Sequence, residues 1–105
     1  LPNQLARQGK IVFIDITADW CLTCKVNKFL VTDTMDVKEL FQKHKVTVLR
    51  LDWTKPNYEI KRFLSRKGRY GIPFNEIYGP SLPNGKIFPE LLNQNTIKEY
   101  ITLAK

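Results

Sequence analysis

The chain has 105 residues, of which 43% are hydrophobic, and it contains no long apolar run. This composition predicts one domain over residues 1–105 with a real core, and it excludes a transmembrane helix or a secretory signal within these residues. The net charge of +7 favours acidic partners, but the basic residues are scattered and form no nucleic-acid motif, so we expect no nucleic-acid partner. The chain begins at Leu1 and its only methionine is Met35, so we expect it to be a fragment of a larger protein.

The first half of the chain predicts a strand followed by two helices, or by one helix with a break near Asp33. The strand is the apolar run at residues 10–16. Behind it, side chains recur at helical spacing: Leu22, Val26, Phe29 and Leu30, then Val37, Leu40, Phe41 and His44. Asp36 and Glu39 have the spacing of a capping box, which predicts the start of the second helix near Asp36.

The second half predicts three more strands and two helices. A β-branched, partly alternating strand is expected at 46–53, ended by Pro56 and Asn57, and a helix around 60–64 that Gly68 terminates. Residues 74–78 predict a strand, 79–85 a turn, 86–88 a short strand and 97–104 a final helix. The order β-α-α-β-α-β-β-α predicts an α/β fold with a central mixed sheet and helices on both faces.

Cys21 and Cys24 are the only cysteines and form a C-x-x-C pair directly after the first strand. A disulfide that closes a loop of two residues constrains the unfolded chain very little, so exchange chemistry explains the cysteine pair better than a stabilising structural disulfide does. At a helix N-terminus, unpaired backbone N–H groups and the helix dipole favour the thiolate, which is the reacting form. Cys21, at the mouth of the helix and open to a visiting protein, is the candidate nucleophile, and Cys24 is the candidate resolving thiol.

This order of elements, with Trp-Cys-Leu-Thr-Cys-Lys at 20–25 and the Ile72-Pro73 step, resembles the thioredoxin fold over nearly the whole chain. Residues 18–27, 52–54 and 71–80 look more narrowly like the C-terminal, periplasmic thioredoxin-like domain of DsbD-type transmembrane thiol–disulfide interchange proteins. The resemblance implies a protein-disulfide reductase on the periplasmic side of the bacterial inner membrane. It would take electrons from the transmembrane domain of its own protein and pass them to the N-terminal domain and other periplasmic partners.

The resemblance also assigns roles to residues around the cysteines. Asp15 matches the buried acid behind the active site, and its place between Ile14 and Ile16 supports a buried acceptor and donor for the proton of Cys24; a solvated acid at a strand edge or end is the alternative. Pro73 matches the cis-proline that faces the dithiol, where the Ile72 backbone would bind an extended substrate chain; a trans proline at a strand edge is the alternative.

Trp20 is expected to form an apolar lip beside Cys21, with ordinary core packing as the alternative. Trp53 is expected in the core, and His44 at its boundary.

Two basic residues are expected to tune the acidity of the site. Lys28 stands where DsbD-type domains often carry an acid, and its spacing from Cys24 places it on the cysteine face of the helix. It should favour the Cys21 thiolate or pair with Asp15, unless it points into solvent. Arg50 takes the strand position at which thioredoxins place a lysine near the buried acid, so it is a possible partner of Asp15 or a plain surface residue.

Other functions remain open at this point. A free-standing extracytoplasmic thioredoxin, serving for instance cytochrome maturation, would use the same residues. A metal-binding domain has only Cys21, Cys24 and the distant His44 as ligands, too few for a closed zinc site. A redox-silent docking module would not need both cysteines. We expect no cofactor and no metal, and a monomeric isolated domain.

Overall fold

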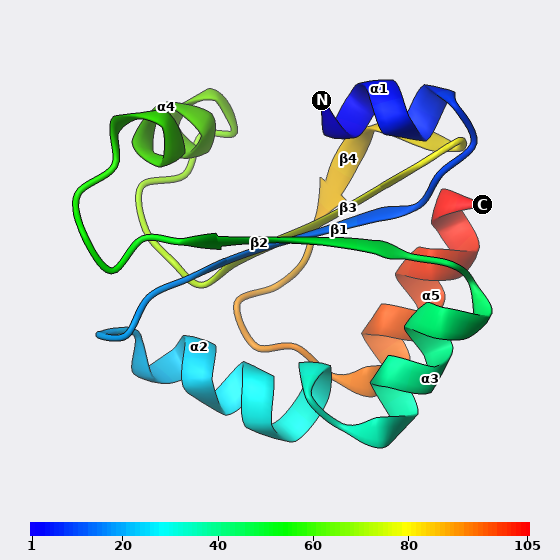
Figure 1. The fold of residues 1–105 in the computed structure, drawn as a ribbon, viewed down its shortest axis with the longest axis horizontal. Coiled ribbons are helices and arrows are strands. Elements are labelled where there is room, and N and C mark those ends of the chain that lie inside the picture. The colour runs from blue at the N-terminus through cyan, green and yellow to red at the C-terminus, as the bar shows by residue number, and fades with distance from the viewer.

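The computed structural model describes all of residues 1–105, which form a four-stranded sheet with the order β2-β1-β3-β4 (Figure 1). The strands are β1 (Val12–Thr17), β2 (Thr47–Asp52), β3 (Phe74–Gly79) and β4 (Leu82–Ile87). β1 pairs in parallel with β2 and antiparallel with β3, and β3 and β4 form an antiparallel hairpin. The mixed sheet predicted from the order of elements is therefore confirmed.

Helices cover both faces of this sheet, as Figure 1 shows. α1 (Pro2–Arg7) and α4 (Tyr58–Arg66) lie on one face. The other face is covered by α2 (Leu22–Asn27), the π-helical turn η1 (Lys28–Thr32), α3 (Met35–Lys43) and α5 (Gln94–Ala104). None of these helices is long and apolar enough to span a bilayer.

β1 is buried on both sides because it lies between two other strands. Val12, Ile14 and Ile16 pack towards α1 and α4. Phe13 packs on the opposite face, where its ring centroid is 5.2 Å from that of Phe41 and 5.5 Å from that of Phe88. The continuous apolar run is thus a two-sided core strand, since successive side chains point to opposite faces.

The start of α3 differs from the sequence expectation. Thr34, not Asp36, is the N-cap, and its hydroxyl accepts the Val37 N–H at 3.4 Å. Asp36 lies in the first turn, where its negative charge interacts favourably with the positive end of the helix dipole. The predicted break between the two helices is confirmed, because η1 ends at Thr32 and α3 begins at Met35.

Two other elements were missed or misplaced. The short helix α1 was not predicted; Pro2 begins it, and Ala6 is buried against the sheet. β4 begins at Leu82, four residues before the predicted strand, because Gly79 already pairs with Leu82 across a tight hairpin. Gly85 therefore lies inside β4, with a left-handed φ of +86°.

Candidate active site

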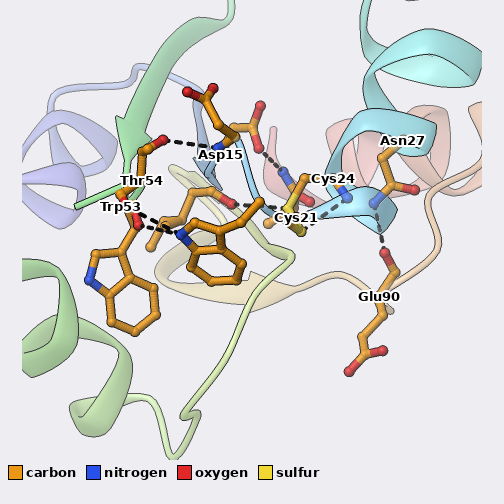
Figure 2. The surroundings of a disulfide bond; sticks show 11 residues. Asp15, Cys21, Cys24, Asn27, Trp53, Thr54 and Glu90 are labelled. Carbon is orange, nitrogen blue, oxygen red and sulfur yellow. Dashed lines mark hydrogen bonds between the residues drawn. A yellow bond between two sulfur atoms is a disulfide. The ribbon is translucent and has the colours of Figure 1, made fainter. Parts of the chain in front are cut away.

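Cys21 and Cys24 lie where β1 leads into α2 and are joined by a disulfide, with their Cα atoms 5.3 Å apart (Figure 2). Cys21 is the N-cap of α2, and its Sγ accepts the backbone N–H of Cys24 at 3.2 Å. The Sγ of Cys24 lies 4.0 Å from the carbonyl oxygen of Ile16 on β1. A sulfur that caps a helix receives the N–H groups that stabilise a thiolate, so this geometry favours Cys21 as the reacting sulfur.

Solvent exposure does not distinguish the two cysteines. Cys21 is 6% exposed and Cys24 is 7% exposed, so the expectation that Cys21 is open is wrong for the disulfide-bonded form. Both cluster with Ala18, and the half-buried Trp53 and Ile72 pack against them. What sets Cys21 apart is its position as the N-cap, together with its two exposed sequence neighbours.

Trp20 is one of these neighbours, and it is 60% exposed, which excludes core packing; the lip beside Cys21 stays a prediction. Its indole N–H donates to the carbonyl oxygens of Trp53 at 3.2 Å and Thr54 at 3.3 Å (Figure 2). The Asp19 N–H donates to the Thr54 hydroxyl at 2.9 Å. The segment before α2 is therefore fastened to the segment that follows β2.

That second segment is shaped by Asp52 and Thr54. The Asp52 carboxylate accepts from both the hydroxyl and the backbone N–H of Thr54, and these two hydrogen bonds hold the pKa of Asp52 below its usual value. This turn presents the carbonyl groups that bind Trp20. This turn was not predicted from the sequence, although an Asp two residues before a Thr is a local turn signal.

Asp15 lies on β1, on the sheet face that α2 covers, and its side chain is 13% exposed. Its partner is Arg50, whose Nε donates to Oδ2 at 3.1 Å, as the sequence suggested. Asn75 donates from Nδ2 to Oδ1 at 3.0 Å. Strand register brings the three together, because Asp15 pairs with Arg50 on β2 and with Asn75 on β3. Asn75 was missed, and only the register could have identified it.

Lys28 does not join this network. It is exposed, and the ion pairs of the structure are Asp15–Arg50 and Glu76–Lys67, so the expected pairing of Lys28 with Asp15 is wrong. The buried face of α2 runs instead through Cys21, Cys24 and Asn27, at a spacing of three residues. Lys28 begins η1, one position beyond that face, and points outward.

Asn27 is a buried residue that sequence reasoning also missed. Its Nδ2 donates to the Glu90 carbonyl oxygen at 2.8 Å, and its Oδ1 accepts the Leu92 N–H at 3.0 Å (Figure 2). One side chain thus joins the cysteine helix to the segment between β4 and α5. Its spacing of three residues from Cys24 was the only available signal.

The Ile72–Pro73 peptide bond is cis. An open groove of about 290 Å³ runs beside it, and its walls include Tyr70, Ile72, Pro73, Phe88 and Glu90. Asn27 holds the backbone of Glu90, so one wall of this groove is tied to the cysteine helix. Ile72 contributes to the groove and also packs against the cluster of Ala18, Cys21 and Cys24.

His44 lies away from this chemistry, half-buried at the C-terminal end of α3. Burial and the charges of Lys105 and Lys43 lower its pKa. No group of three or more His, Cys, Asp or Glu side chains gathers where it could hold a metal ion.

Comparison with known proteins agrees with this geometry. A family model described as thioredoxin-like matches residues 3–80. The thiol:disulfide interchange protein DsbD of Pseudomonas sp. is 39% identical over 71 residues, which cover 68% of this chain and 11% of that protein. The DsbD of Haemophilus ducreyi is 35% identical over 69 residues, covering 65% of this chain and 12% of that protein. The chain thus spans a small part of the length of these relatives.

The oxidised C-terminal domain of Neisseria meningitidis DsbD has the same fold. It superposes with a TM-score of 0.74 at 17% identity, covering 98% of this chain and 89% of that domain. The fold and the disulfide of a C-x-x-C pair at a helix N-terminus define a thiol–disulfide oxidoreductase. The chain belongs to the thioredoxin-like family.

Proposed function

We propose that this chain is the electron-donating thioredoxin-like domain of a larger, DsbD-like membrane protein. In this role it faces the periplasm, is reduced by the membrane-embedded part of its own protein, and reduces disulfides of periplasmic partner proteins. Cys21 as the N-cap of α2 is the observation that carries the proposal, because the helix terminus favours the attacking thiolate. The likeness to the thiol:disulfide interchange protein DsbD supports the exchange activity, and the direction of electron flow is the part of the proposal that the glutathione equilibrium tests.

The exchange proceeds in two displacements. The Cys21 thiolate attacks one sulfur of the partner disulfide, a mixed disulfide forms, and the other partner sulfur leaves as a thiolate. Cys24 then loses its proton and attacks the Cys21 sulfur, which forms the Cys21–Cys24 disulfide and releases the second partner thiolate. Two electrons and, after protonation, two hydrogens have passed to the partner.

The surrounding residues support this sequence of steps. Asp15, held by Arg50 and Asn75, is the acceptor we assign to the Cys24 proton, and it returns a proton when the dithiol is regenerated. Trp20 shields the mixed disulfide from water. The Ile72 backbone, beside the cis-proline, binds the partner chain in an extended form.

The equilibrium between this dithiol and a glutathione buffer tests the proposed direction. An electron donor holds its disulfide more strongly than glutathione does, so most of the protein should stay oxidised until reduced glutathione is in large excess. Reduction of insulin disulfides by the reduced protein tests the activity itself. A dithiol that is readily formed by glutathione would reverse the assigned direction, and absence of any exchange would refute the function.

A further inference from the structure

The helix that carries the cysteines leaves an apolar stripe uncovered. Leu22, Val26, Phe29 and Leu30 are exposed, Leu22 by 76% and Phe29 by 80%; we call these four residues the outer stripe. Their spacing places them along one side of α2 and η1. In Figure 1, α2 lies at the periphery of the molecule with no other element on its outer side. This is the apolar pattern from which the sequence predicted the helix, and it faces away from the core.

Leaving such residues in water is unfavourable. Burying a Leu or Phe side chain completely is worth about 1.5–3 kcal/mol, and contiguous exposed apolar patches mark interaction sites. The core does not need the outer stripe, because Cys24, Asn27 and Val31 already fill the inner face of the same segment. The outer stripe is therefore available to a partner without disturbing the fold.

Within the segment from Trp20 to Thr32, which carries the outer stripe, all charges are positive. Lys25 and Lys28 are exposed on the same segment, and the sequence contains no Asp or Glu between Asp19 and Asp33. A surface that is apolar and bordered by cations complements one that is apolar and bordered by carboxylates.

The first residue of the outer stripe is next in sequence to the reacting cysteine. Leu22 follows Cys21 directly, and the exposed Trp20 precedes it. A molecule that brings a sulfur to Cys21 covers Trp20 and Leu22, and it reaches Val26 and Phe29 if it extends along the helix. A lipid surface also suits apolar and cationic residues, but it carries no sulfur and gains nothing from the adjacent Cys21. This continuity favours a protein partner.

We propose that the outer stripe is the docking surface for a protein segment that carries the exchanging sulfur and is itself apolar and acidic. The proposal rests on the proposed function, since disulfide exchange at Cys21 is what brings the partner to this helix. Docking there raises the rate of attack because it holds the partner sulfur beside Cys21.

Three synthetic peptides test the proposal. Each carries one cysteine as a mixed disulfide with thionitrobenzoate, which leaves when Cys21 attacks the peptide sulfur. One peptide is apolar and acidic, the second is apolar and basic, and the third is acidic with its apolar residues replaced by Ser. We expect the reduced protein to attack the first about tenfold faster than either of the others, corresponding to roughly one additional buried side chain. Added salt should reduce its advantage over the basic peptide.

Matched variants locate the effect. Phe29→Ser and Leu30→Ser should each remove most of the preference for the apolar acidic peptide. Leu103→Ser on α5 replaces a leucine of comparable exposure, 46% against 59% for Leu30, and should keep that preference. All three sites are exposed, so we expect the variants to fold, and circular dichroism is the check.

Equal rates for the three peptides, or a preference that survives Phe29→Ser and Leu30→Ser, would overturn the proposal. Binding to phosphatidylglycerol vesicles that Phe29→Ser abolishes, together with equal peptide rates, would assign the outer stripe to lipid and overturn it as well. The small disulfide 5,5′-dithiobis(2-nitrobenzoate) separates this failure from failure of the function. It should react at the same rate with all variants, and its failure to react with the parent protein would refute the exchange function itself.

Discussion

The structure has two ion pairs, Asp15–Arg50 and Glu76–Lys67, which lie on opposite faces of the sheet. Asn75 binds Asp15, which pairs with Arg50 on the face that α2 covers. Glu76 points to the other face and pairs with Lys67 at 2.8 Å. The Arg50 side chain is 42% exposed, whereas that of Glu76 is only 1% exposed. The first pair is therefore partly open to solvent, while Glu76 of the second pair is buried in the structural core.

The surroundings of Lys67 strengthen this contrast. Its Nζ donates to the Asn84 carbonyl oxygen at 3.1 Å and lies 5.0 Å from the ring centroid of Tyr78. Burial alone would lower the pKa of Lys67, but its interactions with Glu76 and Tyr78 together outweigh burial and raise it. Glu76 depends on this partner, because its Oε1 has no hydrogen bond.

Removing the cation from the buried pair should have the largest effect. Lys67→Met leaves the Glu76 carboxylate buried without its partner and should lower the free energy of unfolding by about 3 kcal/mol. Urea unfolding measures the loss, and Lys61→Met, an exposed lysine on α4, is the control. The rate of reaction with a small disulfide should not change in the folded variant. A loss of stability no larger than that of Lys61→Met would mean that the buried Glu76–Lys67 pair is no more important for stability than an exposed lysine.

Crowding the buried pair should have the next largest effect. Gly85 has a positive φ, and an added Cβ would collide with the Glu76 carboxylate. Gly85→Ala should therefore cost about 2 kcal/mol or more of stability. Gly9→Ala is the matched control, because Gly9 has a φ of +90° but open space around it, so only backbone strain remains. Equal costs for the two variants would mean that contact with Glu76 contributes nothing.

The partly exposed Asp15–Arg50 pair should affect the rate of disulfide exchange more than the stability of the fold. Asp15→Asn removes the proposed proton acceptor and should slow insulin reduction about tenfold around neutral pH. Since partly exposed ion pairs contribute little, the free energy of unfolding should change by less than about 1 kcal/mol. Rates measured from about pH 6 to about pH 9 should differ in shape between the two proteins. Superimposable profiles would remove Asp15 from the mechanism.

The smallest expected effect is a loss of folding stability at alkaline pH, caused by deprotonation of the groups around the buried Glu76–Lys67 pair. Burial raises the pKa of Tyr78 above 10.0, and the pKa of Lys67 is raised above 10.5. The folded state therefore holds both protons more tightly than the unfolded state does. The stability they contribute is complete below pH 10.0 and is lost as the pH rises through the folded pKa values.

Tyr78→Phe should therefore reduce the decline of the unfolding free energy between about pH 9 and about pH 11. The exposed Tyr70, changed to Phe, serves as the control. If the unfolding free energy of both variants declines with pH as steeply as that of the parent protein, the titration of Tyr78 is not linked to folding.

The features that the sequence predicted correctly depend on local pattern or on strand order. The C-x-x-C pair, the helix ended by Gly68 and the mixed sheet follow from short-range signals and from the connections between elements. The Asp15–Arg50 contact followed from a resemblance and is explained by the parallel register of β1 and β2. These features need no knowledge of side-chain packing.

The features that were missed depend on tertiary contacts. Helical spacing showed that residues 22–30 form a helix, but not which side faces the core, and Asn27 rather than the outer stripe is buried. Glu76 on β3 meets Lys67, the C-cap of α4, only through the tertiary fold. The short helix α1 is stabilised by the packing of Ala6 on the sheet, and six residues carry too weak a pattern to predict it.

The central claim is that Cys21 attacks and Cys24 resolves. Single-cysteine variants test it directly, because a protein that cannot resolve the mixed disulfide accumulates it. Reduced Cys24→Ser and Cys21→Ser are each mixed with insulin, and the covalent adducts are quantified by intact-mass spectrometry. The account predicts a stable mixed disulfide on Cys21 in Cys24→Ser and little adduct in Cys21→Ser. Equal adduct in the two variants, or more on Cys24, would contradict it.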